Sequence, residues 1–166
     1  MKQLSIFAAQ DLEEPKREKI VWQLYVDGAA RGNPGPAGAG IYIKKEEKAF
    51  IKQGFYLGKK TNNQAEYLAL ILGLCQLLSE AHPQDEIQIF SDSELLIRQI
   101  MGIYKVKDAT LQRLYKRLMA MLESRLYVVK HVMREKNSIA DALANEGVDK
   151  KIHVPLALQH YCNLAA

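Results

Sequence analysis

Residues 20–26 alternate apolar and polar side chains, the pattern of a β-strand with one buried face. That face would carry Trp22, Leu24 and Val26. Residues 29–40 are rich in glycine and proline and predict a turn. Two further strands are predicted at 39–44 and 50–57, joined by a charged loop at 44–48, so the first third of the chain predicts an antiparallel meander.

From residue 61 the apolar positions take on helical spacing. A capping-box pair, Thr61 and Gln64, opens a helix that runs to residue 78 and is apolar on nearly every side, so we expect it to be buried. Ser91 and Glu94 have the same spacing and predict a helix to about residue 101, after a short strand at 87–90. The remaining predicted elements are a helix at 108–123, a strand at 126–132 and a helix from Asn137 or Ser138 to about residue 146.

The element order βββαβααβα predicts an α/β fold, in which helices pack on a mixed sheet of five strands. A length of 166 residues fits one folded domain. We place this domain at residues 19–149, after an N-terminal extension at 1–18. A C-terminal tail at 150–166 would hold a short helix interrupted by Pro155.

The composition is that of a soluble globular protein, with 48% hydrophobic and 25% charged residues. No apolar run approaches the roughly 20 residues that span a bilayer, and residues 1–10 lack the features of a signal peptide. A cytoplasmic protein with no membrane partner is therefore expected. Cys75 and Cys162 lack metal-binding spacing, and we expect two unpaired thiols in a reducing compartment.

The net charge of +4 is unevenly distributed. Residues 104–136 contain nine Lys and Arg against three acidic residues, so this segment carries +6 and the rest of the chain −2. Such a segment suits a phosphate backbone, but a solvent-exposed basic helix face has the same composition. Charge alone leaves both interpretations open.

Four acidic residues stand beside separate local motifs: Asp27 in YVDGAARGNPGPAG, Glu66 in TNNQAEY, Asp92 in IFSDSE and Asp141 in REKNSIADALAN. Asp27 and Asp92 follow predicted strands, and the other two lie in the first turns of predicted helices, places where sites form in open sheets. Acids near helix starts also have a structural explanation, since the helix dipole stabilises them. Asp27 lacks that explanation, so we predict a divalent-metal site around it.

These motifs resemble type 1 ribonuclease H. The matching residues run in the family's order over about residues 20–147: Asp27-Gly28 with Gly32-Asn33-Pro34-Gly35-Pro36, Thr61-Asn62-Asn63-Gln64 with Glu66, Ser91-Asp92-Ser93, and Asn137 with Asp141, Leu143 and Ala144. The resemblance implies a ribonuclease H-like sheet with strand order 3-2-1-4-5. It also implies metal-dependent hydrolysis of the RNA strand of RNA/DNA hybrids.

The implied chemistry uses two Mg²⁺ ions, with Mn²⁺ as the alternative, held by Asp27, Glu66, Asp92 and Asp141. Asp27 would be shared by both ions, and the products would be a 5′-phosphate and a 3′-hydroxyl. The family also implies contacts to the RNA strand from Gly28, Asn33, Thr61, Asn62 and Asn63, although turn and capping chemistry explains the same amide residues. His131, ten residues before Asp141, is the candidate for proton transfer, and Arg134 is its rival.

Two departures from the family pattern stand out. Glu94 replaces a substrate-contacting glutamine, and an acid there would repel a phosphate. Asp92 and Asp141 are 49 residues apart, too close to hold the basic protrusion of longer members, which makes this the short form.

A non-catalytic nucleic-acid-binding module of the same fold is the alternative function, but such a module is expected to lack a carboxylate. A transposase or integrase core shares the fold and the metal chemistry, yet the TNNQAEY and GNPGP motifs favour ribonuclease H. No obligate protein partner is evident, and a monomer is expected.

Overall fold

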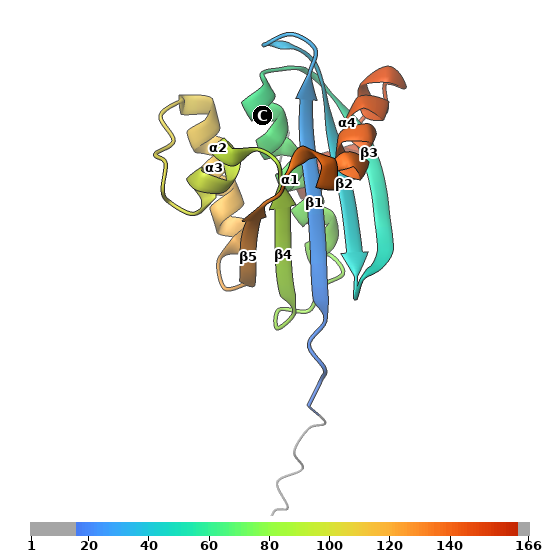
Figure 1. Cartoon of the computed structure of the whole chain (residues 1–166), viewed down its shortest axis with the longest axis vertical. Coiled ribbons are helices and arrows are strands. Elements are labelled where there is room, and N and C mark those ends of the chain that lie inside the picture. Colours follow the sequence, from blue (N-terminus) through green and yellow to red (C-terminus); the bar gives the residue numbers. More distant parts are fainter. Residues whose placement is uncertain (1–15, 163–166) are drawn as a thin grey trace, which may run out of the picture.

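The computed structural model describes residues 16–162 and contains one five-stranded mixed sheet with the strand order β3-β2-β1-β4-β5 (Figure 1). This order confirms the predicted fold class. The strands are β1 (Val21–Ala30), β2 (Gly35–Lys45), β3 (Lys48–Lys60), β4 (Glu86–Ser91) and β5 (Leu126–His131). The α-helices are α1 (Asn62–Leu78), α2 (Glu94–Ile100), α3 (Ala109–Leu122), α4 (Ser138–Asp149) and α5 (Leu156–Tyr161), with a 3-10 turn at Arg134–Lys136.

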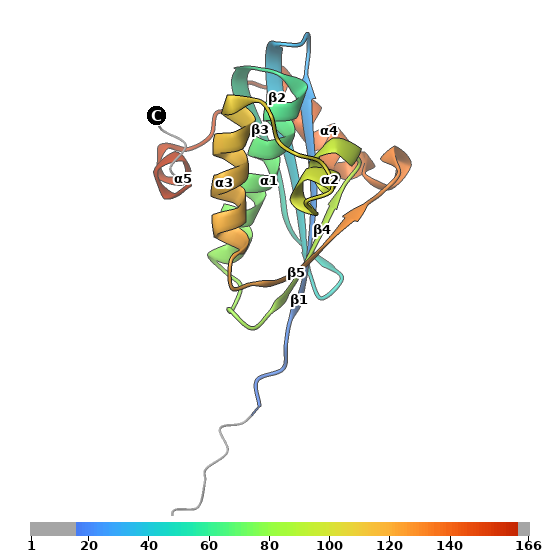
Figure 2. The same ribbon diagram turned by 90° about the vertical axis from the view of Figure 1, so that its left-hand side faces the viewer.

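The two faces of the sheet carry different helices. α1 and α3 lie on one side and α4 on the other (Figure 2). Leu24 and Val26 of β1 contact Gly73 of α1, and this side holds the largest buried side chains, Trp22 and Tyr67 among them. The apolar character of α1 on all sides is explained by this position between the sheet and α3.

The first two strands are longer than predicted. β1 continues through Asp27 to Ala30, and β2 begins at Gly35, so only residues 31–34 turn the chain. The prediction of a turn at 29–40 was wrong because these glycines serve packing: a Cβ at Gly38 or Gly40 would collide with the backbone of α4. Close approach of α4 therefore requires glycine inside the strand.

The helix starts were predicted with mixed success. Thr61 caps α1 in a complete capping box with Gln64, as expected. The predicted cap of α2 was wrong by two residues, since Ser93 accepts from the Leu96 amide and Ser91 ends β4. Asn137 precedes α4 but makes no side-chain cap; its amide is used elsewhere.

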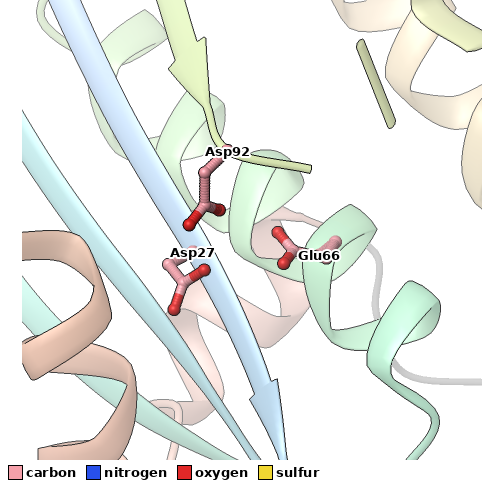
Figure 3. Close-up of side chains that lie close together, drawn as sticks. All are labelled: Asp27, Glu66 and Asp92. Carbon is pink, nitrogen blue, oxygen red and sulfur yellow. The ribbon is translucent and has the colours of Figure 1, made fainter. Parts of the chain in front are cut away.

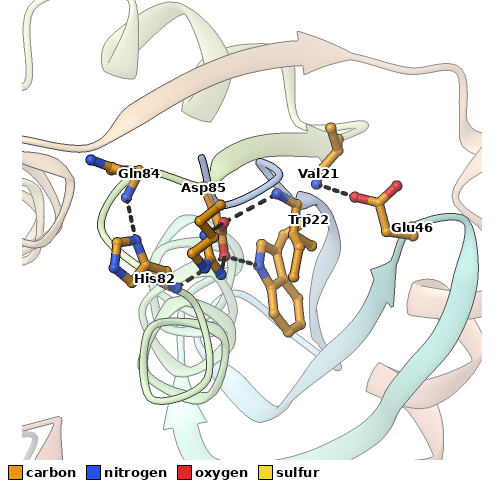
Figure 4. A network of polar contacts seen from close by, with 8 residues as sticks. Val21, Trp22, Glu46, His82, Gln84 and Asp85 are labelled. Carbon is orange, nitrogen blue, oxygen red and sulfur yellow. Dashed lines mark hydrogen bonds and ion pairs between the residues drawn. The ribbon is translucent and has the colours of Figure 1, made fainter. Parts of the chain in front are cut away.

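A buried carboxylate, Asp85, fastens the chain at the start of the sheet (Figure 4). It accepts hydrogen bonds from Trp22 Nε1 (3.0 Å) and the His82 amide (3.0 Å), and Arg17 Nη1 lies 2.6 Å from its Oδ1. These bonds hold the pKa of Asp85 below its usual value despite the opposing effect of burial. Arg17 belongs to the predicted N-terminal extension, so contacts with the folded domain begin before residue 19.

The C-terminal segment also packs on the domain. Tyr56 of β3 donates its amide to Ile152 O (2.6 Å), and Leu158 of α5 packs against the core. Cys75 of α1 and Cys162 form a disulfide with Cα atoms 6.0 Å apart, so the prediction of two unpaired thiols was wrong. The pairing joins positions 87 residues apart, which local sequence spacing does not reveal. No helix in residues 16–162 is long and apolar enough to cross a membrane.

Candidate active site

Three carboxylates from three different elements meet at the end of the sheet. Asp27 lies in β1, Glu66 in α1 and Asp92 directly after β4 (Figure 3). Each offers one oxygen, and these oxygens lie within 4.8 Å of one another. Three of the four predicted carboxylates therefore come together as a group that could hold a cation.

Strand pairing and one glycine explain this convergence. β1 and β4 are parallel with Tyr25 opposite Phe90, so the residues two places further along, Asp27 and Asp92, are brought to the same place. A Cβ on Gly28 would collide with the backbone of Ala65 and Glu66. Only glycine allows α1 to approach β1 this closely. Glu66 is the fifth residue of α1, beyond the first turn where the sequence placed it.

Asp141 lies at the edge of this group. It is in the first turn of α4 and lines the same cavity, but it is not within the close set of three. Arg134 Nη2 is 3.5 Å from its Oδ1. Asn137 anchors this end of α4, since its buried Nδ2 donates to Val26 O (2.9 Å), one residue before Asp27. The sequence analysis missed this role, because a bond spanning 111 residues has no local pattern.

The electrostatics of the group favour a bound cation. Burial, and then the charges of Asp92 and Asp141, raise the pKa of Asp27 to about 8. The pKa of Glu66 is raised well above its usual value by burial first and then by Asp27 and Asp92. Glu66 Oε2 is buried with no hydrogen-bond partner among the described residues. A hard divalent ion such as Mg²⁺ would supply the missing partner and neutralise the group, so the residues fit that metal.

A cavity of about 570 Å³ surrounds the carboxylates. Of the predicted substrate contacts, Gly28, Asn62 and Asn63 line it, whereas Asn33 and Thr61 do not. Asn33 Oδ1 accepts from the Asn62 amide (3.1 Å), and Asn62 Oδ1 accepts from the Ala30 amide (3.0 Å). Asn33 thus connects the turn at residues 31–34 to the start of α1, where Asn62 lies.

The two rival side chains for proton transfer or phosphate binding both line the cavity. His131 is exposed at the end of β5, and its Nε2 lies 3.1 Å from the carbonyl oxygen of Asp92. Arg134 is 79% exposed at the side chain. Ser93, which the sequence analysis treated only as part of a motif, lines the cavity as well and caps α2.

Comparison with known proteins places this geometry in a family. A family model described as "Reverse transcriptase-like" matches residues 25–147. The chain is 39% identical over 127 residues to "Ribonuclease HI" of Halobacterium salinarum, covering 75% of this chain and 63% of that relative. It is 32% identical over 150 residues to "Ribonuclease H" of Coxiella burnetii, covering 81% of this chain and 94% of that relative. The chain belongs to the ribonuclease H family.

A solved ribonuclease H structure, LC11-RNase H1 in complex with an RNA/DNA hybrid, superposes with a TM-score of 0.72 and 41% identity. The match covers 80% of this chain and 98% of that one.

Two departures from the family pattern can be located in the structure. α2 is connected to α3 by residues 101–108, which contain no helix. Glu94 lies outside the cavity and pairs with Arg98, Oε1 to Nε 2.8 Å. Its charge is therefore partly balanced by its own helix.

Proposed function

We propose that this chain hydrolyses the RNA strand of RNA/DNA hybrids as an endoribonuclease dependent on magnesium. The observation that carries the proposal is the group of three converging carboxylates, in which the buried pair Asp27 and Glu66 have raised pKa values and Glu66 has an unpartnered oxygen, as expected of a site for a divalent cation. The hybrid-bound relative supports the substrate class. The chain spans 63% of the Halobacterium relative, so that relative's activity is carried over as a proposal only.

Asp27, Glu66, Asp92 and Asp141 would hold two Mg²⁺ ions, with Asp27 shared and Mn²⁺ as the alternative metal. When bound, such ions lower the pKa of a coordinated water and stabilise negative charge on the leaving oxygen, which gives a 5′-phosphate and a 3′-hydroxyl. Asp141 is held at the edge of the group by Arg134 and by the anchored start of α4. Its position suits completion of a metal shell once the cation attracts it.

The side chains around the cavity would orient the hybrid. The side-chain oxygens of Asn33 and Asn62 accept hydrogen bonds that join the end of β1 and the following turn to the start of α1, and neither Nδ2 donates to another described residue. Their amide groups are therefore available to 2′-hydroxyls in the shallow minor groove, together with Asn63 and the backbone of Gly28. Thr61 would contribute by fixing the start of α1.

The test is cleavage of labelled RNA/DNA hybrid, duplex RNA and duplex DNA with Mg²⁺. We expect cleavage of the hybrid's RNA strand alone, and loss of at least about a hundredfold of the rate in Asp92→Asn, which keeps the side-chain size but removes the charge. Wild-type rates in that variant would remove the proposed metal role. Hybrid binding with no cleavage in the unaltered protein would instead assign a non-catalytic binding module.

A second experiment separates His131 from Arg134. His131 beside the Asp92 carbonyl would move a proton or assist product release, and its loss should lower turnover by about tenfold or more. A His131→Ala protein with a loss of less than about threefold would assign that step away from the imidazole. Arg134→Ala is the matched variant, and a larger effect there would favour electrostatic stabilisation of the phosphate.

A further inference from the structure

A buried hydrogen bond joins α1 to α2. Tyr67 Oη donates to Gln99 Oε1 over 2.7 Å, and the two residues are 1% and 5% exposed. Burial raises the pKa of the Tyr67 hydroxyl, so this group stays protonated and remains a donor. Gln99 is the polar member of the buried face of α2, beside Leu96, Ile97 and Ile100. A buried polar pair is satisfied in a narrow range of geometries, so the bond specifies how α2 lies against α1.

Each of these two helices is attached directly to a carboxylate of the site. Glu66 is the neighbour of Tyr67 in α1, so its backbone is held wherever α1 is held. Asp92 directly precedes Ser93, which caps α2 by accepting a hydrogen bond from the Leu96 amide (3.2 Å). The backbone of Asp92 is thus joined to the start of α2. The way in which α1 and α2 lie together therefore affects the separation of the two carboxylates.

Glu66 and Asp92 repel one another when both are charged. With Asp27, they each offer an oxygen within 4.8 Å of the others (Figure 3). α1 is packed extensively on β1, whereas α2 makes much sparser contact with α1, β4 and β5. The repulsion therefore acts on a helix that few other contacts hold in place. The bond between Tyr67 and Gln99 opposes it, one residue away from Glu66.

We propose that Tyr67 and Gln99 are positioning residues of the carboxylate group, whose hydrogen bond sets the separation of Glu66 and Asp92 before a divalent cation binds. This inference rests on the proposed function. Neither Tyr67 nor Gln99 lines the carboxylate cavity, so the pair acts through the two carboxylates and does not touch the substrate. Ligands that are already arranged bind a cation more tightly, because less free energy is spent on ordering them.

The test measures Mn²⁺ binding to substrate-free protein by electron paramagnetic resonance, since Mn²⁺ accepts the same oxygen ligands as Mg²⁺. Tyr67→Phe removes the hydroxyl and keeps the ring, and should raise the Kd for Mn²⁺ by about fivefold. In cleavage of labelled hybrid, the Mg²⁺ concentration for half-maximal rate should rise by a similar factor. At saturating Mg²⁺, kcat should stay within about twofold and KM for the hybrid should not change, because the bound cation itself draws the carboxylates together.

A double-mutant cycle tests the bond itself. Gln99→Leu breaks the same hydrogen bond from the side of α2 and should raise the Kd for Mn²⁺ about as much as Tyr67→Phe does. The protein with both substitutions should bind Mn²⁺ no more weakly than either single variant, because one bond is lost only once. Effects that multiply would show two independent contributions and would overturn the role of the bond.

The matched control is Trp22→Phe, which also removes a buried hydrogen bond, the one from Nε1 to Asp85 (3.0 Å). Trp22 lies five residues before Asp27 in β1, roughly 17 Å along the strand. This variant should melt at a lower temperature but bind Mn²⁺ within about twofold of the unaltered protein.

Two results would overturn the positioning role. One is a Tyr67→Phe protein that binds Mn²⁺ as tightly as the unaltered protein, and the other is an equal loss of affinity in Trp22→Phe, which would reflect stability alone. Failure of the proposed function is read separately, since unaltered protein that neither binds Mn²⁺ nor cleaves the hybrid would overturn the metal site itself. Circular dichroism verifies that each variant is folded.

Discussion

At the scale of single residues, Asp27 and Glu66 occupy surroundings that disfavour their own charge. Burial is the first cause in both cases, and the neighbouring carboxylates add to it. Such an arrangement costs stability in the absence of a cation and is typical of functional sites. Binding a cation requires these two side chains to be charged, whereas their burial in the fold disfavours that charge.

This conflict predicts a pH dependence of stability in metal-free protein. Folded Asp27 keeps its proton up to about pH 8, whereas the unfolded chain loses it near pH 4. The folded state thus binds more protons between these values, so this contribution to the free energy of unfolding is complete below about pH 4 and lost as the pH rises through about 8. The slope should reach about 1.4 kcal/mol per pH unit for one proton.

Urea unfolding in EDTA from pH 4 to 9 measures this slope. Asp27→Asn should flatten it, leaving the part due to Glu66, and should stabilise the metal-free protein at pH 8. Glu123→Gln removes an exposed carboxylate and should leave the slope unchanged. Parallel profiles for wild type and Asp27→Asn would contradict the elevated pKa.

Residues of the site differ in how far the sequence predicts them. Asp27, Glu66 and Asp92 were predicted from strand ends and motifs, and the structure brings them together. Asn137 carries no comparable pattern, because its bond to Val26 depends on how α4 meets the sheet. The packing role of Gly28 was also missed, since the backbone it contacts is 37 residues away and known only from the fold. The residue types in the sequence indicate the chemistry of a site, but they do not show which residues contact one another across the core.

At the scale of elements, local rules predicted every strand and α-helix of the domain but not all of their ends, nor the 3-10 turn at Arg134–Lys136. Thr61 and Asp108 were correctly placed at helix starts because their caps are local bonds. Ser91 was predicted to start α2, but it pairs with His131 in the sheet, and Ser93 caps the helix instead. The extension of β1 beyond Asp27 likewise depends on its pairing with β2.

The disulfide between α1 and residue 162 predicts a stability that depends on redox conditions. Closing a loop of this length restricts the unfolded chain, and polymer estimates give about 4 to 5 kcal/mol for a sequence separation of 87. Cys162→Ala should therefore melt at a lower temperature than wild type under oxidising conditions. Dithiothreitol should lower the wild-type melting temperature to about that of the variant.

The variant itself supplies the control, because its melting temperature should not respond to dithiothreitol. Cys162 is buried, so reduction should be slow in native protein and faster under partly denaturing conditions. Identical melting of oxidised wild type and Cys162→Ala would show that the tail is held by its other contacts, among them the Tyr56 to Ile152 hydrogen bond.

At the scale of the whole molecule, the basic segment at 104–136 is divided between two faces. Arg113 and Lys116 are exposed on α3, which packs with α1. Lys130 lies over Phe90 on the opposite face of the sheet. A segment that appears as one block of charge in the sequence therefore serves two surfaces, and the sheet separates them.

This division predicts how hybrid binding responds to salt. In this chain α2 and α3 are joined without an intervening helix, so we expect exposed cations such as Arg113 and Lys116 to supply phosphate contacts for the hybrid. Each contact contributes about 0.9 to the slope of log Kd against log salt concentration. Binding measured on the Asp92→Asn background, which prevents cleavage, should weaken steeply as salt rises. Arg113→Gln with Lys116→Gln should make the slope shallower by about 1.8.

Lys48→Gln with Lys150→Gln is the control for total charge, because both side chains are exposed and neither belongs to the basic segment. Its slope should match that of the parent. A flat salt response of the parent protein would mean that hydrogen bonds in the minor groove, and not phosphate contacts, hold the hybrid. If the Lys48 and Lys150 substitutions changed the salt slope as much as the Arg113 and Lys116 substitutions, net charge would act at long range, without a defined surface on α3.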